Sequence, residues 1–186
     1  MHQASQYLIT PGRPLSCMAI VVGSGAGGAT VAKELAEAGH RVLLIEKGPE
    51  ISEEDAYRHY ANVDAGVKLM RTCCLGGTTM VSAGNAMRCL ENELRGFGID
   101  LASEFTEAQQ ELGVQELPDA LIGEGTRRLM DAASRLGLLV RKMPKFIDPG
   151  RCCQDGRCSF GCPVQARWNA ARFVDAARGH GAKVLT

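Results

Sequence analysis

Residues 18–46, MAIVVGSGAGGATVAKELAEAGHRVLLIE, contain two apolar runs separated by a stretch with helical spacing. Residues 18–22 are short, apolar and rich in β-branched side chains, as is typical of a buried parallel strand. Residues 41–46 form a second run of this kind. Residues 26–38 predict a helix that ends at Gly39 and has apolar side chains at helical spacing at Val31, Leu35 and Ala38. This strand–helix–strand order predicts a parallel α/β sheet with right-handed crossovers.

A glycine-rich turn joins the first strand to the helix. Gly23, Gly25 and Gly28 fit the pattern GxGxxG, in which the glycines allow a tight turn, close approach of a pyrophosphate, and close packing of helix on strand. The helix N-terminus offers N–H groups and a positive dipole end to phosphates. Glu46 follows the second strand and can accept hydrogen bonds from an adenosine ribose, while its charge disfavours NADP. The predicted dinucleotide contacts are Gly23, Gly25, Ala26, Gly27, Gly28, Glu46 and Lys47; a purely structural turn is the alternative.

A second glycine motif lies at residues 71–85, RTCCLGGTTMVSAGN, and a cysteine motif, CSFGCP, at residues 158–163. Together with residues 23–28, these motifs resemble the glucose-methanol-choline (GMC) oxidoreductases, particularly their cysteine-containing bacterial and archaeal branch. The resemblance extends over residues 18–186 and implies FAD as the cofactor. Two glycines allow close backbone approach, and hydroxyl and amide groups can hydrogen-bond the polar edge of a flavin. By matching position, the resemblance implies flavin contacts at Gly76, Gly77, Thr78, Thr79 and Asn85.

The implied fold is an α/β, Rossmann-like FAD-binding domain with a parallel sheet, incomplete, and with helical and loop insertions. Residues 1–16 are interpreted as a tail and residues 17–186 as the FAD-binding domain. Between the motifs, residues 73–87 predict an irregular loop and residues 138–142 a short strand. Further helices are predicted at residues 53–70, 104–112, 121–136 and 166–178, followed by a strand at residues 182–185. The first of these helices would present one face formed by Ala56, Tyr60, Val63, Val67 and Met70.

Four cysteines cluster near the end of the sequence. Cys152, Cys153, Cys158 and Cys162 are spaced CCx4Cx3C, with a proline after the last. The second half matches a bacterial ferredoxin motif, whereas the first half departs from it because Asp155 stands where a cysteine is needed. An iron–sulfur cluster, a zinc site or disulfide, and packing without any ligand all stay open. The pair Cys73-Cys74 lies beside the second glycine motif.

Charge and hydropathy exclude some classes of partner. Basic and acidic residues number 21 each, which gives no support to nucleic acid or anionic membrane as the main partner. Residues 1–123 carry 9 basic and 16 acidic side chains, and residues 124–186 carry 12 and 5. The basic second half is either a solvated surface or a docking surface for an acidic partner. The sequence lacks an apolar run of about 18 residues and an export signal, so we expect a cytoplasmic protein without a transmembrane segment.

The family resemblance implies an FAD-dependent oxidoreductase that acts on CH–OH groups of alcohols or sugars and passes hydride to the flavin. We expect a second polypeptide to supply the substrate-binding and catalytic half, because a strand at residues 182–185 would present an exposed edge that recruits other chains. A flavin and iron–sulfur electron-transfer subunit of a larger complex and an inactive, truncated remnant are the alternatives. No catalytic base is assigned among the histidines, which are His2, His40, His59 and His180.

Overall fold

The structure, a computed structural model, describes residues 15–61 and 71–186. These residues form two compact units, the first containing the described residues up to Val81 together with Asn169–Thr186, and the second containing Ser82–Trp168. The first unit is therefore built from two segments that lie far apart in the sequence. Almost all of the predicted tail at residues 1–16 lies outside the described residues.

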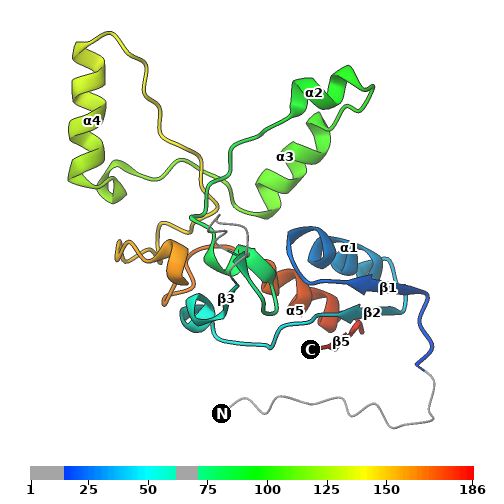
Figure 1. Cartoon of the computed structure of the whole chain (residues 1–186). Helices are drawn as coiled ribbons and strands as arrows, with labels where there is room; N and C mark the ends of the chain where they lie inside the picture. The colour runs from blue at the N-terminus through cyan, green and yellow to red at the C-terminus, as the bar shows by residue number, and fades with distance from the viewer. Residues whose placement is uncertain (1–14, 62–70) are drawn as a thin grey trace. The chain divides into compact units, whose positions relative to one another are not determined.

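A parallel sheet of three strands forms the centre of the first unit (Figure 1). Its strands are β1 (Ala19–Val22), β2 (Val42–Ile45) and β5 (Lys183–Leu185), in the order β1-β2-β5. Ala19 pairs with Val42, and Leu43 pairs with Lys183. The strands predicted at residues 18–22, 41–46 and 182–185 are confirmed. Read from β5 to β1, the order equals the 3-2-1 half of the doubly wound dinucleotide-binding fold.

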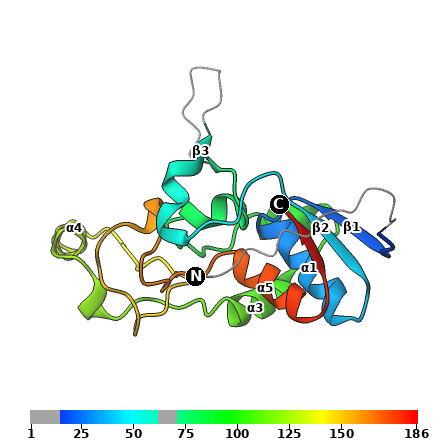
Figure 2. The same cartoon turned by 90° about the horizontal axis from the view of Figure 1, so that it is seen from below.

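Two helices, α1 (Ala26–Glu37) and α5 (Ala171–Gly179), lie side by side on the sheet (Figure 2). The buried residues of α1 are Ala29, Ala32 and Ala36, and those of α5 are Phe173, Val174 and Ala177. Small side chains on α1 let the two helix backbones approach closely. The helix predicted at residues 26–38 is confirmed, but its buried face is this alanine stripe, whereas Val31 is 49% exposed.

The helix predicted over residues 53–70 is wrong over its described part. The chain forms a 3₁₀ helix, η1 (Glu53–His59), and then β3 (Tyr60–Ala61), which pairs antiparallel with β4 (Arg71–Thr72). In an α-helix the carbonyl of Ala56 would accept from the N–H of Tyr60. Instead it accepts from the Thr72 hydroxyl at 2.8 Å, and the Tyr60 N–H donates to Tyr57. The remaining predicted face positions, Val63, Val67 and Met70, lie outside the described residues.

The helix predicted at residues 166–178 begins only at Ala171. Arg167 forms an antiparallel bridge with Ile147, which fixes an extended backbone there. The Asn169 side-chain oxygen accepts from the Ala171 N–H at 3.0 Å, just before the helix begins. A β-bridge and a local side-chain bond therefore replace the first helical turn that the apolar spacing predicted.

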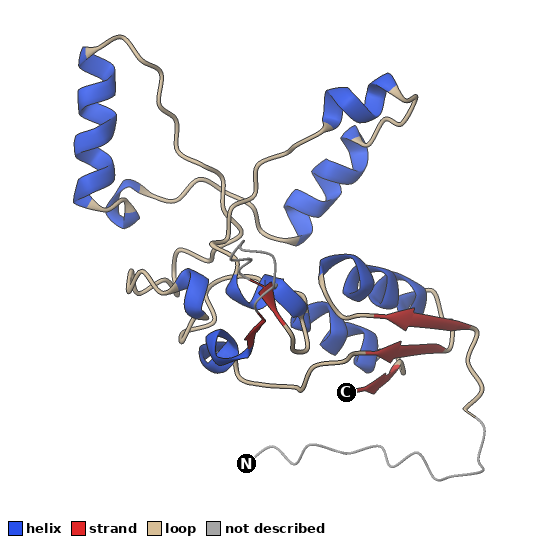
Figure 3. Ribbon diagram, in the orientation of Figure 1, coloured by secondary structure: helices blue, strands red, loops and turns tan. Residues whose placement is uncertain are grey.

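The second unit consists of helices joined by long loops (Figure 3). Its elements are α2 (Glu91–Gly96), α3 (Ala102–Glu111), η3 (Asp119–Leu121), α4 (Glu124–Arg135) and η4 (Cys158–Phe160). The predicted helices at residues 104–112 and 121–136 are confirmed, whereas α2 was not predicted. The strand predicted at residues 138–142 is wrong, because that segment pairs with no described strand and exposes Leu138 and Leu139 by 61% and 77%.

One face of β1 is apolar and exposed. The exposed fractions are 60% for Ile20 and 80% for Val22, and 67% for Met18 just before β1. Strands of parallel sheets are normally covered on both faces. Among the described strands, β1 pairs with β2 alone. No helix within residues 15–61 and 71–186 combines the length and apolar character needed to cross a membrane.

Candidate dinucleotide site

Each glycine of the first motif has its own structural reason. Gly23 has a φ of +89°, which a residue with a side chain rarely adopts. A Cβ at Gly28 would lie 1.9 Å from the carbonyl oxygen of Gly23, so only glycine lets α1 pack against this turn. A Cβ at Gly25 would meet nothing within 4 Å. The three positions therefore match the tight turn, the close packing and the open approach that a pyrophosphate requires.

The N-terminus of α1 is suited to an anion. Gly25 is the N-cap residue and provides no side-chain cap, and the first turn of α1 contains no acidic residue. Ala26 and Gly27 are exposed, and a Cβ at Gly27 would also meet nothing within 4 Å. The first N–H groups of a helix have no partner within the helix, so this end can donate several hydrogen bonds to a phosphate while its dipole attracts the charge.

Glu46 holds the first glycine loop to the end of β2. One carboxylate oxygen, Oε2, accepts from the Ser24 hydroxyl at 2.6 Å and from the Ser24 N–H at 2.8 Å. The other, Oε1, accepts from the Gly48 N–H at 2.8 Å. Glu46 therefore anchors two loops through both of its carboxylate oxygens.

These hydrogen bonds keep Glu46 ionised. Burial raises the pKa of Glu46, but the hydrogen bond from the Ser24 hydroxyl and those from the backbone N–H groups of Gly48, Ser24 and Lys47 outweigh burial. The pKa of this carboxyl therefore lies below its usual value. An ionised Glu46 accepts hydrogen bonds and repels a 2′-phosphate.

The second glycine motif lies directly against the first. Gly76 N–H donates to the Ser24 hydroxyl oxygen at 3.0 Å, and a Cβ at Gly77 would lie 3.1 Å from the Cα of Gly25. Both glycines have positive φ, +88° and +55°. A short 3₁₀ helix, η2 (Gly77–Val81), follows, within the predicted irregular loop. The structure therefore brings together the two motifs, which are separated by about 50 residues in the sequence.

Gly48 permits another close approach that sequence reasoning missed. A Cβ at Gly48 would lie 2.3 to 2.4 Å from backbone atoms of Cys73 and Cys74, and the Leu75 N–H donates to the Pro49 carbonyl at 2.9 Å. The segment before the second glycine motif therefore rests on the turn after β2. Only the position of Gly48, two residues after Glu46, could have indicated its role. Ser24 was also missed, because it occupies an unspecified position of GxGxxG.

The other predicted cofactor contacts have different surroundings. Lys47 and Thr78 are exposed. The Thr79 hydroxyl donates to the Gly76 carbonyl at 2.6 Å and accepts from the Ala170 N–H at 2.9 Å, so it joins the second glycine motif to the start of α5. Asn85 belongs to the second unit, where its side-chain oxygen accepts from Lys145 at 2.6 Å. Flavin contacts at these positions stay predictions.

Three of the four clustered cysteines share one apolar environment in the second unit. Cys162 is buried with Ile147 and Ala166, and Cys152 and Cys158 pack against this cluster, whereas Cys153 is exposed. Burial raises the pKa of the Cys158 thiol. Over the described part of the chain, no three His, Cys, Asp or Glu side chains are grouped closely enough to hold a metal ion. Of the three interpretations of this cluster, packing of thiols fits the observed surroundings best.

The pair beside the second glycine motif consists of one buried and one half-buried thiol. Cys74 is fully buried, and burial raises its pKa to about 11. A thiol with that pKa stays protonated near neutral pH and is a poor nucleophile. Cys74 therefore serves as a small apolar core residue, in contact with Ala56, Met80 and Val81.

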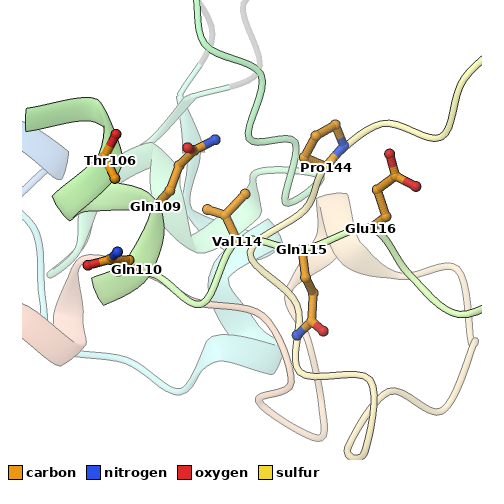
Figure 4. Close-up of a pocket in the computed structure, with 7 residues that line it drawn as sticks. All are labelled: Thr106, Gln109, Gln110, Val114, Gln115, Glu116 and Pro144. Atoms are coloured by element: carbon orange, nitrogen blue, oxygen red, sulfur yellow. The ribbon is translucent and has the colours of Figure 1, made fainter. Parts of the chain in front are cut away.

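A separate shallow pocket of about 310 Å³ lies in the second unit (Figure 4). It lies between the end of α3 and the segment around Pro144, and none of the predicted site residues lines it. Its lining residues are Thr106, Gln109, Gln110, Val114, Gln115, Glu116 and Pro144. Both polar and apolar side chains line this pocket.

Comparison with known proteins places this geometry in a family. Residues 21–79 match the model of the NAD(P)-binding Rossmann-like domain. A GMC-type oxidoreductase of Mycobacterium tuberculosis, itself uncharacterized, is 33% identical over 196 residues, which cover 90% of this chain and 31% of that protein. The chain belongs to the GMC-type oxidoreductases.

Other GMC-type matches agree on the region. The long-chain-alcohol oxidase FAO4B of Arabidopsis thaliana is 28% identical over 197 residues, which cover 92% of this chain and 26% of that oxidase. The crystal structure of pyridoxine 4-oxidase from Mesorbium loti superposes with a TM-score of 0.62 at 19% identity, covering 92% of this chain and 42% of that one. The predicted Rossmann-like α/β fold is confirmed. This GMC-type chain spans 31% and 26% of the two curated relatives' lengths and matches their N-terminal part.

Proposed function

We propose that this chain is the FAD-binding part of a GMC-type oxidoreductase that oxidises a CH–OH group of an alcohol or sugar. The observation that carries the proposal is the junction of the two glycine motifs at Ser24 and Glu46, beside the open N-terminus of α1. The name of the Arabidopsis relative, a long-chain-alcohol oxidase, supports an alcohol over a sugar.

The chain's own residues bind and orient the cofactor in this proposal. N–H groups at the start of α1 hold the pyrophosphate, Glu46 accepts from the adenosine ribose, and the loop containing Gly76 and Gly77 approaches the flavin. When bound, FAD supplies the capacity to accept a hydride from the substrate carbon. In this proposal, residues 17–186 function together as one FAD-binding domain, and the second unit is an insertion in that domain.

The test of FAD binding is the variant Gly25→Val. Its side chain would occupy the space next to the α1 N-terminus, while the φ of −65° at Gly25 accommodates any residue. We expect loss of FAD binding with an unchanged unfolding temperature. Gly123→Val is the matched control, because Gly123 is the N-cap of α4 with a φ of −62° and open surroundings. Retention of FAD by Gly25→Val at wild-type occupancy would remove the phosphate site from this loop, and a wild-type chain that binds no FAD would favour the inactive remnant.

A second polypeptide that supplies the substrate-binding and catalytic half is part of the proposal. It is supported by the 31% of the Mycobacterium tuberculosis relative that the chain spans and by the bare apolar face of β1. Doubly wound sheets continue beyond the strand equivalent to β1, so we expect the added polypeptide to cover Ile20 and Val22. The basic residues 124–186 offer an acidic partner a second contact.

Coexpression tests this partner. With the polypeptide encoded by the neighbouring open reading frame, solubility and flavin occupancy should rise for the wild type and not for Val22→Lys. Leu129→Lys is the control, since Leu129 is similarly exposed, at 63%, but lies on α4. Equal rescue of Val22→Lys and the wild type would contradict docking at β1.

An iron–sulfur electron-transfer subunit is the second candidate function. Its support is the cysteine spacing in the sequence, because Cys152, Cys158 and Cys162 lie around one apolar cluster but are not grouped closely enough in the described chain to hold a metal ion. We expect iron and labile sulfide in anaerobically purified protein if this candidate is correct, and their loss in Cys158→Ser but not in Cys89→Ser, which changes an exposed thiol. Protein without iron or sulfide would leave the thiols as packing groups.

The eight thiols also support a reducing compartment, and we propose the cytoplasm.

A further inference from the structure

The Ser24 side chain contacts both glycine motifs and is completely buried. Its hydroxyl has one hydrogen to donate and two lone pairs. It donates to Glu46 Oε2 at 2.6 Å and accepts from the Gly76 N–H at 3.0 Å. A single hydroxyl therefore joins the carboxylate at the end of β2 to the first residue of the second glycine motif's turn.

The connection is not duplicated by side chains from those loops. The Ser24 N–H also donates to Glu46, whereas the Gly76 N–H donates to the Ser24 hydroxyl oxygen. At the neighbouring position, a Cβ on Gly77 would lie 3.1 Å from the Cα of Gly25, so the two loops approach closely there. If the hydroxyl is removed, Glu46 loses its shortest hydrogen bond and a buried N–H loses its acceptor.

We propose that Ser24 is a positioning residue that couples the adenosine side of the FAD site, at Glu46, to the flavin side, at the Gly76 turn. The inference rests on the proposed FAD binding. Because the hydroxyl is satisfied on both sides, displacement of the Gly76 turn changes the orientation of the Glu46 carboxylate, and the reverse holds. The two halves of the cofactor are then recognised as a unit instead of independently.

The experiment is a double-mutant cycle on FAD affinity with Ser24→Ala and Glu46→Gln. Loss of a buried hydrogen bond to a charged group corresponds to roughly tenfold to hundredfold weaker binding, and we expect Ser24→Ala to fall in this range. We expect the effect of Glu46→Gln to shrink in the Ser24→Ala background, because the carboxylate is no longer held in place. Thr30→Ala is the control, since its hydroxyl bonds only within α1.

The outcomes separate this inference from the proposed function. Failure of the wild-type chain to bind FAD would overturn the proposed function. Wild-type affinity in Ser24→Ala, or strictly additive effects of the two substitutions, would overturn the coupling and leave FAD binding intact. If Ser24→Ala does not fold, Ser24→Cys replaces it, because a thiol keeps a weak donor and acceptor at the same position; partial loss with the same non-additivity is then expected.

Discussion

Helices α1 and α4 are both 12 residues long and both follow a glycine N-cap, yet their surroundings differ. Helix α1 buries Ala29, Ala32 and Ala36, whereas α4 buries only Ala133. Helix α1 is thus held by packing against α5 and the sheet. Helix α4 relies on local interactions such as the ion pair between Glu124 and Arg128, one turn apart. The difference teaches that α4 is stabilised mainly by local interactions, whereas α1 is stabilised mainly by its neighbours.

The largest effect that would sharpen this comparison is expected for Gly28→Ala. The added Cβ would lie 1.9 Å from a backbone oxygen that cannot move aside, so the free energy of unfolding should fall by about 3 kcal/mol or more. Chemical denaturation measures this change. A loss below about 1 kcal/mol would mean that α1 shifts freely on the glycine turn.

Glu46→Ala extends the comparison to the carboxylate that holds the loop before α1. We expect FAD binding to weaken by about 1.5 to 3 kcal/mol, the scale of a charge-assisted hydrogen bond, as measured by titration calorimetry. Equal affinity in the variant would remove Glu46 from the cofactor site. Glu34→Ala, which changes an exposed carboxylate on α1, is the control.

The pH dependence of stability also reports on Glu46. Its folded-state pKa is below the usual 4.5, so its contribution is fully present above that value and is lost as pH falls through the folded pKa. We expect the wild-type chain to lose more stability than Glu46→Gln between neutral pH and the acid range. Parallel pH profiles for the two proteins would contradict this expectation.

Overpacking tests the alanine stripe of α1 directly. Ala32→Leu should reduce the free energy of unfolding by about 1 to 3 kcal/mol, because Ala32 is fully buried and has no room for added methylenes. Ala132→Leu adds the same volume at an exposed position of α4 and should be close to neutral. Similar losses in both variants would mean that α4 is packed as tightly as α1.

The smallest expected effect has the opposite sign. Gly125 lies in the first turn of α4, and a Cβ there would meet nothing within 4 Å. Gly125→Ala should stabilise the second unit by at most about 1 kcal/mol through helix propensity. Hydrogen exchange of α4 amides measures this gain. A loss of stability would show that α4 is covered by something at this point.

Much of the first unit could be predicted because its signals are local. The apolar runs and the glycine spacing at residues 18–46 are enough to predict β1, α1 and β2 without reference to other segments. The same holds for α3 and α4, whose periodicity lies within the segment. The pattern failed at residues 53–61, where the controlling partner, Thr72, lies 16 residues from Ala56.

The parts of the candidate site could be predicted from the sequence, but the hydrogen bonds that connect them could not. Gly25 and Glu46 follow from the motif, whereas the role of Ser24 depends on Gly76, 52 positions away. The need for glycine at residue 48 likewise arises from backbone atoms of Cys73 and Cys74. Contacts of this kind depend on how two loops meet in space, and no local spacing in the sequence encodes them.

The interleaving of the first unit also determines when it can fold. Leu43 on β2 pairs with Lys183 on β5, a separation of 140 positions. At a synthesis rate of roughly 5 to 20 residues per second, about 7 to 28 seconds pass between the synthesis of β2 and that of β5. Contacts of such long sequence separation are slow to form. Until β5 pairs with it, one edge of β2 has unpaired backbone groups. The parallel sheet of the first unit therefore stays incomplete until β5 has been made, although its first two strands are made first.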